Sequence, residues 1–435
     1  MKRPLPSAQM LKNRGPASRT AARPAPVECD LTIAEIGARG DGAALGEGGP
    51  FYLPYSLPGE RVRARLYGER GEIAAILAPS AERVAPPCPH FGRCGGCQLQ
   101  HWAETPYLAW KRALVASACA KRGLDIDVEE IISAWGDGRR RAAFHANASG
   151  RFGFMARGSS GLIDVAACPV MTPGLQAALP RLRALAVQFA PERGDITIAV
   201  LETEAGLDVD IKGAGAPAHF NAARLEQAAC AADDADLARL SFNSETLVAR
   251  RIPVLTMGAA RVTPPPGAFT QPTRSGEDAL AALALSALTG AARIADLFAG
   301  IGTFALRFAK QAEVHAVDGE QAMVAALKQA ADGAGGALKT VSVERRDLLR
   351  APFAALELKR FDGVAFDPPR SGARGQAQQI AASKAEKVAA ISCDPAAFAR
   401  DARILVDGGF KLTRVTPIDQ FRWSPHVEIV GAFER

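Results

Sequence analysis

The chain has 435 residues, of which 48% are hydrophobic and 23% charged, with eight cysteines and a formal net charge of +6. This length allows two to four domains with a sizeable core. It contains no apolar run near the ~20 residues of a membrane span and no signal-peptide pattern, so we expect a cytoplasmic protein without a membrane partner. Eight cysteines in such a chain more often bind metal than form disulfides.

Residues 1–27 carry the whole net charge. Six basic residues precede the first acidic residue, Glu28, and the rest of the chain is formally neutral. The composition of this stretch, rich in Pro, Ala, Ser and Arg, predicts a disordered basic tail. The tail can serve solubility alone or bind phosphates, and its Arg-rich, acid-poor start also resembles a transit peptide.

Residues 28–87 are predicted to form a small β-barrel. Short runs with period-two alternation lie between glycine and proline turns, and the run 62–66 is expected to pair with 73–77, with arginines on the outer face. The stretches GDGAA at 40–44, FYLP at 51–54 and LPGE at 57–60 resemble a TRAM domain, which is an RNA-binding barrel.

A cysteine-rich, glycine-rich loop opens the predicted central domain, residues 88–262. Cys88, Cys94 and Cys97 are separated by five and two residues, and Cys168 would complete a set of four thiolates. Glycines allow the backbone to wrap closely around a metal centre. Four thiolates suit zinc and an iron–sulfur cluster equally well. His90 is a possible substitute ligand, although an ordinary surface histidine is the simpler interpretation.

The rest of the central domain mixes predicted helices and strands. Residues 104–122 show the apolar period of a helix that can pack on the catalytic domain. A local basic set can face either RNA or solvent. This set consists of Arg139, Arg140, Arg141, Arg151 and Arg157. Three prolines and a glycine at 264–267 form a linker to the predicted catalytic domain, residues 263–435, in which a helix is expected over 277–288.

The catalytic domain alternates strands and helices in the manner of an α/β fold. Residues 294–304 predict a strand, a glycine turn and a helix, and such glycines let a ligand approach the backbone. The following strands lead to Asp318, Asp347 and Asp367. One such carboxylate can be a helix N-cap. A series of them predicts a Rossmann-like S-adenosylmethionine-dependent methyltransferase, with Asp318 suited to a ribose diol.

A further buried strand, which begins at Lys387, ends at Cys393. Asp394 and Pro395 follow, and the proline can begin a helix that runs to Val406. In open α/β sheets the chemistry takes place just beyond the carboxyl ends of the strands. A thiol at this point is therefore either a small buried hydrophobe or a nucleophile.

These motifs, taken together, resemble the RNA (uracil-5-)-methyltransferase family. They are the four cysteines, DLFAGIG at 296–302, DPPR at 367–370, SCDP at 392–395 and PHVE at 425–428. The resemblance covers nearly everything after residue 28 and is greatest for the branch that acts on 23S ribosomal RNA. Two departures are mild: Asp394 stands where the family usually has Asn, and Thr303 where Asn is common. The first affects only the positioning beside the nucleophile.

The resemblance implies a [4Fe–4S] cluster at the cysteines, in preference to zinc, and S-adenosylmethionine as methyl donor. It implies that Cys393 adds to carbon 6 of a specific uridine in 23S rRNA and that Glu428 removes the carbon-5 proton. The uridine must be flipped out or unpaired to reach the site. The cofactor would be held by Gln271, Phe298, Thr303, Asp318, Asp347 and Asp367.

Several other interpretations use part of the same pattern. A uridine in transfer RNA and a cytosine in RNA are alternative substrates. A radical enzyme with a TRAM domain would carry its three cysteines at a different spacing. A methyltransferase of exocyclic nitrogen would need Asp367 but not Cys393, and an RNA-binding protein with an inactive pocket would not need the complete set. His426 is either structural or an assistant to the thiol. We expect a monomer.

Overall fold

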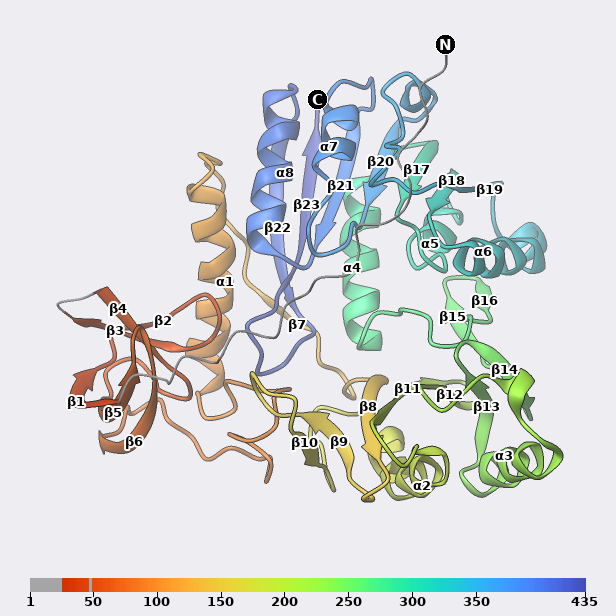
Figure 1. Cartoon of the computed structure of the whole chain (residues 1–435). Helices are drawn as coiled ribbons and strands as arrows, with labels where there is room; N and C mark the ends of the chain where they lie inside the picture. Colours follow the sequence, from red (N-terminus) through yellow and green to blue (C-terminus); the bar gives the residue numbers. More distant parts are fainter. Residues whose placement is uncertain (1–25, 47–48) are drawn as a thin grey trace, which may run out of the picture. The chain divides into compact units, whose positions relative to one another are not determined.

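The computed structural model describes residues 26–46 and 49–435, which divide into two compact units (Figure 1). The smaller unit consists of the described residues up to Glu35 together with 42–80, and the larger one of 36–41 and 81–435. The predicted disordered tail, 1–27, lies outside the described residues except for its last two. Within the described residues, no helix has the length and apolar character needed to cross a membrane.

The smaller unit is a six-stranded sheet with the strand order β1-β5-β6-β4-β3-β2. Its strands are β1 (Val27–Thr32), β2 (Glu35–Ile36), β3 (Gly42–Gly46), β4 (Gly49–Leu53), β5 (Arg61–Tyr67) and β6 (Arg70–Ala78). In β5 the side chains of Val62, Ala64 and Leu66 are buried and the arginines between them are exposed. The predicted pairing of β5 with β6 is confirmed. The assignment of a TRAM barrel stays a prediction.

A seven-stranded sheet with the order β10-β9-β8-β11-β12-β13-β14 forms the middle of the chain. Helix α2 packs on β8 and β11 and α3 on β13 and β14, enclosing an apolar core. The strands are β8 (Arg141–Asn147), β9 (Phe152–Met155), β10 (Leu162–Asp164), β11 (Asp195–Thr203), β12 (Gly206–Lys212), β13 (Leu237–Phe242) and β14 (Glu245–Ala249). The helices are α2 (Pro173–Phe189), α3 (Ala222–Asp234) and the 3-10 turn η1 (Pro217–His219), and the hairpin of β15 (Leu255–Met257) and β16 (Ala260–Val262) follows them.

The catalytic part is an eight-stranded sheet with the order β19-β18-β17-β20-β21-β23-β22-β7. Its strands are β7 (Ile132–Ser133), β17 (Arg293–Leu297), β18 (Glu313–Asp318), β19 (Val341–Arg345), β20 (Gly363–Phe366), β21 (Lys387–Ser392), β22 (Lys411–Asp419) and β23 (Glu428–Glu434). The helices are α4 (Arg274–Ala287), α5 (Ala305–Phe308), α6 (Gln321–Gly333), α7 (Arg374–Ala381) and α8 (Pro395–Asp407), with 3-10 turns η2 (Gly335–Ala337) and η3 (Glu357–Arg360).

The direction of the strands in this sheet changes beside β21. The five strands from β19 to β21 are parallel, whereas β23 runs antiparallel to both β21 and β22. This arrangement confirms the predicted Rossmann-like α/β fold. Because β23 is reversed, its first residue lies at the edge where its neighbours end: Ser392 pairs with Ile429, and Ile418 with Glu428.

Helix α1 (Glu104–Ala120) packs against α8 and β22. Its Val115 and Cys119 are buried in the apolar core of the catalytic sheet. The helix predicted over 104–122 is thus confirmed, although it ends at Ala120. Strand β7, from the same part of the chain, extends the catalytic sheet beyond β22. The predicted domain boundaries stay predictions.

The proline linker, residues 264–267, is held to the central sheet by an arginine that also forms a buried ion pair. The guanidinium of Arg239 on β13 donates to both carboxylate oxygens of Asp208 on β12, at 2.8 and 2.6 Å, and to the carbonyl oxygen of Pro264 at 2.7 Å. Burial raises the pKa of Asp208 and the adjacent guanidinium opposes that rise. The linker predicted from its prolines is therefore fixed at its first residue.

A second buried ion pair joins the central sheet to the catalytic part. The guanidinium of Arg140, which directly precedes β8, contacts the carboxylate of Glu277 on α4. The other carboxylate oxygen of Glu277 accepts from Arg307 on α5 at 2.7 Å, and Arg307 also donates to the carbonyl oxygen of Thr303 at 2.7 Å. Arg140, predicted as part of a basic patch, is thus a structural ion-pair partner.

Replacing Arg239 tests the clamp on the linker. Arg239→Leu should lower the free energy of unfolding by about 3–5 kcal/mol, because Asp208 would stay buried without a cation. Arg251→Leu is the matched control, since its partner Asp236 is exposed, and it should cost less than about 1 kcal/mol. Urea unfolding followed by circular dichroism compares them, and equal losses would contradict the assignment.

Candidate active site and cysteine cavity

Four side chains that the sequence predicts as functional meet at one edge of the catalytic sheet. Cys393 follows β21, Glu428 begins β23, Asp367 follows β20 and Asp318 ends β18. Strand pairing brings three of them close together, because Ser392 of β21 pairs with Ile429 of β23 and Phe366 of β20 pairs with Ala390 of β21. This is the edge at which ligands bind in open α/β sheets.

Gln420 connects a predicted cofactor residue with the predicted base. Its amide nitrogen donates to Gln271 Oε1 at 2.7 Å and to Glu428 Oε1 at 3.1 Å, and all three side chains are buried. No motif in the sequence pointed to Gln420. The available signal was a polar residue directly after the apolar strand β22, which is the same signal that identified the aspartates.

Three carboxyl groups of this pocket have raised pKa values. Burial, and then the charge of Asp367, raises the pKa of Glu428 to about 8, against a hydrogen bond from Gln420 that lowers it. Burial raises the pKa of Asp367 to about 7. Asp296 on β17 is fully buried, and burial followed by the charge of Asp367 raises its pKa well above the ordinary value. The pocket therefore favours neutral carboxyl groups unless a cation enters it.

Cys393 lies in the same electrostatic environment. Burial, then the charges of Glu428 and Asp367, raises the pKa of the thiol to about 12, whereas Arg370 lowers it. The thiol is consequently protonated near neutral pH before substrate and cofactor arrive. Arg370 belongs to the motif at 367–370, but the sequence analysis assigned it no separate role. Asp394 accepts from the N–H of Ala397 at 2.9 Å and so caps α8.

The glycine loop after β17 places the backbone of Gly300 beside Asp318. Phe298 has a backbone φ of 65°, which is uncommon for an aromatic residue. The N–H of Gly300 donates to Asp318 Oδ2 at 2.9 Å, and the space beside the Gly300 Cα is open. An open glycine backbone beside a carboxylate fits a nucleoside with a ribose diol.

Thr303 and Asp347 are less closely tied to this edge. The carbonyl oxygen of Thr303 is held by Arg307. One carboxylate oxygen of Asp347 accepts from the backbone N–H groups of Leu349 and Arg350, at 3.1 and 3.3 Å, which is a local capping pattern. The alternative of a helix-type cap, considered for the aspartates from the sequence, thus has support at Asp347.

An exposed aromatic side chain lies two residues from Gln271. The Phe269 side chain is 59% exposed, and the guanidinium carbon of Arg141 lies 5.1 Å from its ring centroid. Sequence reasoning missed this pair, because one phenylalanine after a proline linker has no distinguishing pattern. Exposed aromatic rings beside arginine are suited to stacking on nucleic-acid bases.

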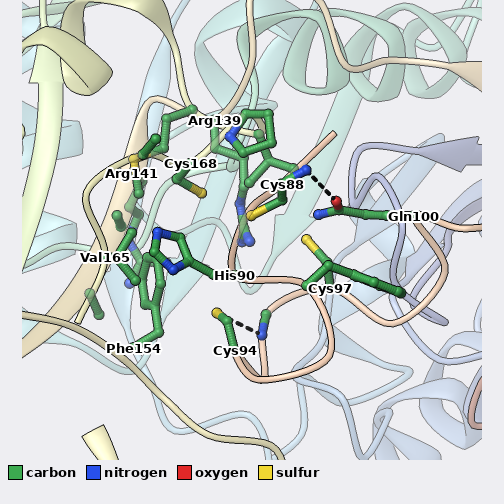
Figure 2. A pocket seen from close by; sticks show the side chains of 18 residues that line it. Cys88, His90, Cys94, Cys97, Gln100, Arg139, Arg141, Phe154, Val165 and Cys168 are labelled. Atoms are coloured by element: carbon green, nitrogen blue, oxygen red, sulfur yellow. Dashed lines mark hydrogen bonds between the residues drawn. The ribbon is translucent and has the colours of Figure 1, made fainter. Parts of the chain in front are cut away.

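The four predicted metal ligands, Cys88, Cys94, Cys97 and Cys168, line one cavity of about 280 Å³. Figure 2 shows their sulfur atoms turned toward a common space. His90 also lines the cavity, but its Nε2 accepts from the backbone N–H of Ala166 at 3.3 Å. This bond occupies one of the two ring nitrogens through which a histidine can bind a metal.

The thiols of the cavity are buried and affect one another. Burial raises the pKa of Cys94, that of Cys97 to about 11 and that of Cys168 to about 12, and the neighbouring cysteines raise each of them further. Within the described residues, no group of three or more His, Cys, Asp or Glu side chains is arranged to hold a metal ion. The four thiols line one common space.

A comparison with solved structures defines the class of fold. The crystal structure of Pyrococcus abyssi tRNA (uracil-54, C5)-methyltransferase in complex with S-adenosyl-L-homocysteine matches with a TM-score of 0.75 and 19% identity. The match covers 93% of this chain and 99% of that one. The chain thus has the fold of an α/β methyltransferase.

Comparisons of sequence define the family. The family model of tRNA (uracil-5-)-methyltransferase matches residues 260–434. An uncharacterized RNA methyltransferase of Caulobacter vibrioides is 46% identical, over 93% of this chain and all of that one. A 23S rRNA (uracil(1939)-C(5))-methyltransferase of Cronobacter sakazakii is 33% identical, over 93% of this chain and 96% of that one. The chain belongs to the RNA (uracil-5-)-methyltransferase family and is an RNA methyltransferase.

The raised pKa of Cys393 predicts a slow reaction with alkylating reagents in the free protein. At pH 7.5 iodoacetamide should modify Cys393 at least ~10-fold more slowly than the exposed Cys230, with a rate that rises with pH as the thiolate forms. Arg370→Gln should slow it further, because Arg370 lowers this pKa. Peptide mass spectrometry measures both sites, and a Cys393 that reacts faster than Cys230 would refute the assignment.

Proposed function

We propose that this RNA methyltransferase transfers a methyl group from S-adenosylmethionine to carbon 5 of a specific uridine in 23S rRNA. The observation that carries the proposal is the sheet edge at which strand pairing brings the buried Glu428 and the half-buried Asp367 beside the end of β21, where Cys393 follows. Carbon 5 of uracil is too weak a nucleophile to take a methyl group unaided, so a thiol and a base in one pocket fit the reaction.

Cys393 opens and closes the reaction. Its thiolate adds to carbon 6 and converts the ring into an enolate, whose carbon 5 forms the new carbon–carbon bond. Bound S-adenosylmethionine would supply the methyl group as a sulfonium electrophile and would depart as the thioether S-adenosylhomocysteine. Glu428 then takes the proton from carbon 5, the carbon 5–carbon 6 double bond forms again, and the sulfur leaves carbon 6 as a thiolate. The thiolate takes back a proton in place of the one that the thiol lost, and the proton on Glu428 passes to solvent, so each turnover releases one proton.

The environment of Glu428 suits the role of base. The carboxylate of a group with a pKa of about 8 is a stronger base than that of an ordinary glutamate, once a cation in the pocket has ionised it. For Cys393 the same environment is unfavourable, so a positive charge must lower its pKa before it can add. Arg370 provides one such charge, and a bound sulfonium would provide another.

The residues at the sheet edge would form the proposed cofactor site. Asp318 beside the open backbone of Gly300 would hold the ribose diol, with Phe298 next to it. Asp367 and Gln271 would face the charged end, since both lie against the Glu428 side of the pocket. Thr303 and Asp347 complete the proposed set with weaker support.

Ribosomal RNA is the proposed substrate because of the relative in Cronobacter sakazakii, which is named for 23S rRNA and matches over nearly its whole length. Transfer RNA remains the second candidate, since the family model and the structural match both carry tRNA in their names. A uridine must leave its stack to reach a strand-end pocket. The exposed Phe269 under Arg141 is placed to stack on the RNA at that point. We expect the enzyme to act in the cytoplasm as a monomer.

Substitutions at Cys393 and Glu428 should fail in different ways. Cys393→Ala should neither methylate RNA nor bond to it, because no enolate forms. Glu428→Gln should still add to the ring and transfer the methyl group, but no base then removes the carbon-5 proton.

Enzyme, RNA and methyl group should accumulate in Glu428→Gln as one covalent species that survives denaturation. A labelled cofactor methyl group and a denaturing gel would reveal it, and mapping the labelled base would identify the RNA. Normal turnover of Glu428→Gln would show that Glu428 is not the base. A covalent species formed by Cys393→Ala would show that the Cys393 thiol is not the nucleophile.

We further infer that the cysteine cavity holds a [4Fe–4S] cluster. The arrangement of the thiols around a space supports it, since the ligands of a cluster are separated by the cluster itself, whereas the thiolates of a zinc site converge on one ion. The buried thiols would ionise on binding iron, which offsets their raised pKa values. The residues Cys88, Cys94, Cys97 and Cys168 would be its ligands.

Iron analysis tests the cluster independently of the reaction. Protein purified without oxygen should be brown and carry about four irons per chain. Cys94→Ser should lose the visible absorbance, whereas Cys230→Ser, outside the cavity, should keep it. Stoichiometric zinc with a colourless protein would overturn the cluster and leave the roles of Cys393 and Glu428 untouched.

A further inference from the structure

The cysteine loop, residues 88–99, is hydrogen-bonded to the segment that ends at the proposed base. This segment, residues 419–428, connects β22 to β23. The backbone N–H groups of Gln98 and Leu99 both donate to the carbonyl oxygen of Trp423, at 2.8 and 3.1 Å. Gln98 directly follows Cys97, whose side chain lines the cavity. These two hydrogen bonds couple the position of the loop at Cys97 to the backbone of Trp423.

Trp423 is held in an uncommon backbone conformation. Its φ is 61°, in the left-handed region that a bulky residue rarely adopts. Its N–H donates to the hydroxyl oxygen of Tyr107 on α1 at 2.9 Å. The carbonyl of Trp423 is therefore held by the cysteine loop and its N–H by α1. A residue keeps such a conformation only where the surrounding structure enforces it.

The same tyrosine anchors the start of the segment. The Tyr107 hydroxyl donates to Asp419 Oδ2 at 2.7 Å, and Lys111 Nζ donates to Asp419 Oδ1 at 2.5 Å and to the carbonyl oxygen of Phe421 at 3.1 Å. The side chains of Tyr107, Lys111 and Asp419 are buried. Buried, fully used polar groups of this kind rigidify the backbone that they contact.

Two contacts connect this segment to the proposed active site and to the cysteine cavity. Gln420, next to Asp419, donates to both Gln271 and Glu428. At the other side Arg139 lines the cysteine cavity, and its guanidinium carbon lies 5.9 Å from the ring centroid of Phe421. The cavity wall and the proposed active site are thus joined through one short stretch of chain.

We propose that the cysteine loop is a positioning element, which aligns Glu428 through Trp423 and is itself kept in place by the group that its cysteines bind. Tyr107 is a positioning residue of the same device. The proposal rests on the proposed function of Glu428. The reaction transfers no electrons, so the cysteines would contribute to it through position alone. A group bound to them would affect the rate of the step in which the carbon-5 proton is removed, and not the rate of the step in which Cys393 adds to the ring.

Hydrogen exchange tests the connection without any need for activity. In full-length protein purified without oxygen, Cys94→Ser should raise the exchange rates of the Gln98, Leu99 and Trp423 amides at least ~10-fold, because the loop loses its anchor. The amides of β20, which lie away from the loop, should not change. Unchanged exchange at these three amides after loss of iron would overturn the proposal.

A second variant avoids the risk that Cys94→Ser misfolds. Tyr107→Phe removes only the hydroxyl that holds Trp423 and Asp419, and Tyr67→Phe in the smaller unit is its matched control. In single-turnover experiments with labelled RNA, Tyr107→Phe should slow the decay of the covalent species ~10-fold and leave its formation within ~2-fold, because a small misplacement of a base is costly. The control should change neither rate.

The outcomes separate the two proposals. Equal slowing of formation and decay by Tyr107→Phe would indicate general damage and overturn the positioning role. Unchanged rates would overturn it as well. If wild-type protein forms no covalent species at all, the proposed mechanism fails, while faster exchange at Trp423 in Cys94→Ser would still establish the connection between the cysteines and this segment.

Discussion

The reversal of strand direction beside β21 is the constraint on which the site depends. Parallel strands deliver their carboxyl ends to one edge of a sheet, and β23, running the other way, delivers its first residue to the same edge. Side chains alternate between the two faces of a strand, so a slip of one residue would turn Glu428 to the opposite face. The ladder of backbone hydrogen bonds therefore fixes the relation between thiol and carboxyl more firmly than a loop would.

The proposed chemistry requires buried ionisable groups, which are usually unfavourable in a folded protein. Burial raises the pKa values of Glu428, Asp367 and Cys393, so each is more stable as a neutral group until a positive charge enters. Such groups cost stability, and active sites are where that cost is retained. Other buried charges, such as Arg239 with Asp208 and Lys111 with Asp419, have direct partners.

The sequence predicted much of the catalytic part, because several strands there are short apolar runs that lead into a polar residue. It predicted the strands that lead to Asp318, Asp347, Asp367 and Cys393, and it predicted the family. It missed Gln420, Phe269 and Trp423, since their roles depend on contacts with residues more than a hundred positions away or on a backbone angle. It also read Arg140 as a surface charge, because only the folded chain brings Glu277 to it. The closed barrel and the domain boundaries stay predictions.

The two buried ion pairs at the linker bear on how an RNA base reaches the pocket. Arg239 fixes the carbonyl of Pro264, and Glu277 is shared between Arg140 of the central part and Arg307 of the catalytic part. A hinge needs a few residues whose backbone angles are free to change, and this junction is pinned on both sides. In the proposed mechanism the work of bringing base and thiol together would then fall on the RNA, whose stacking must break, so the intrinsic looseness of a stem or loop would become part of what this enzyme selects.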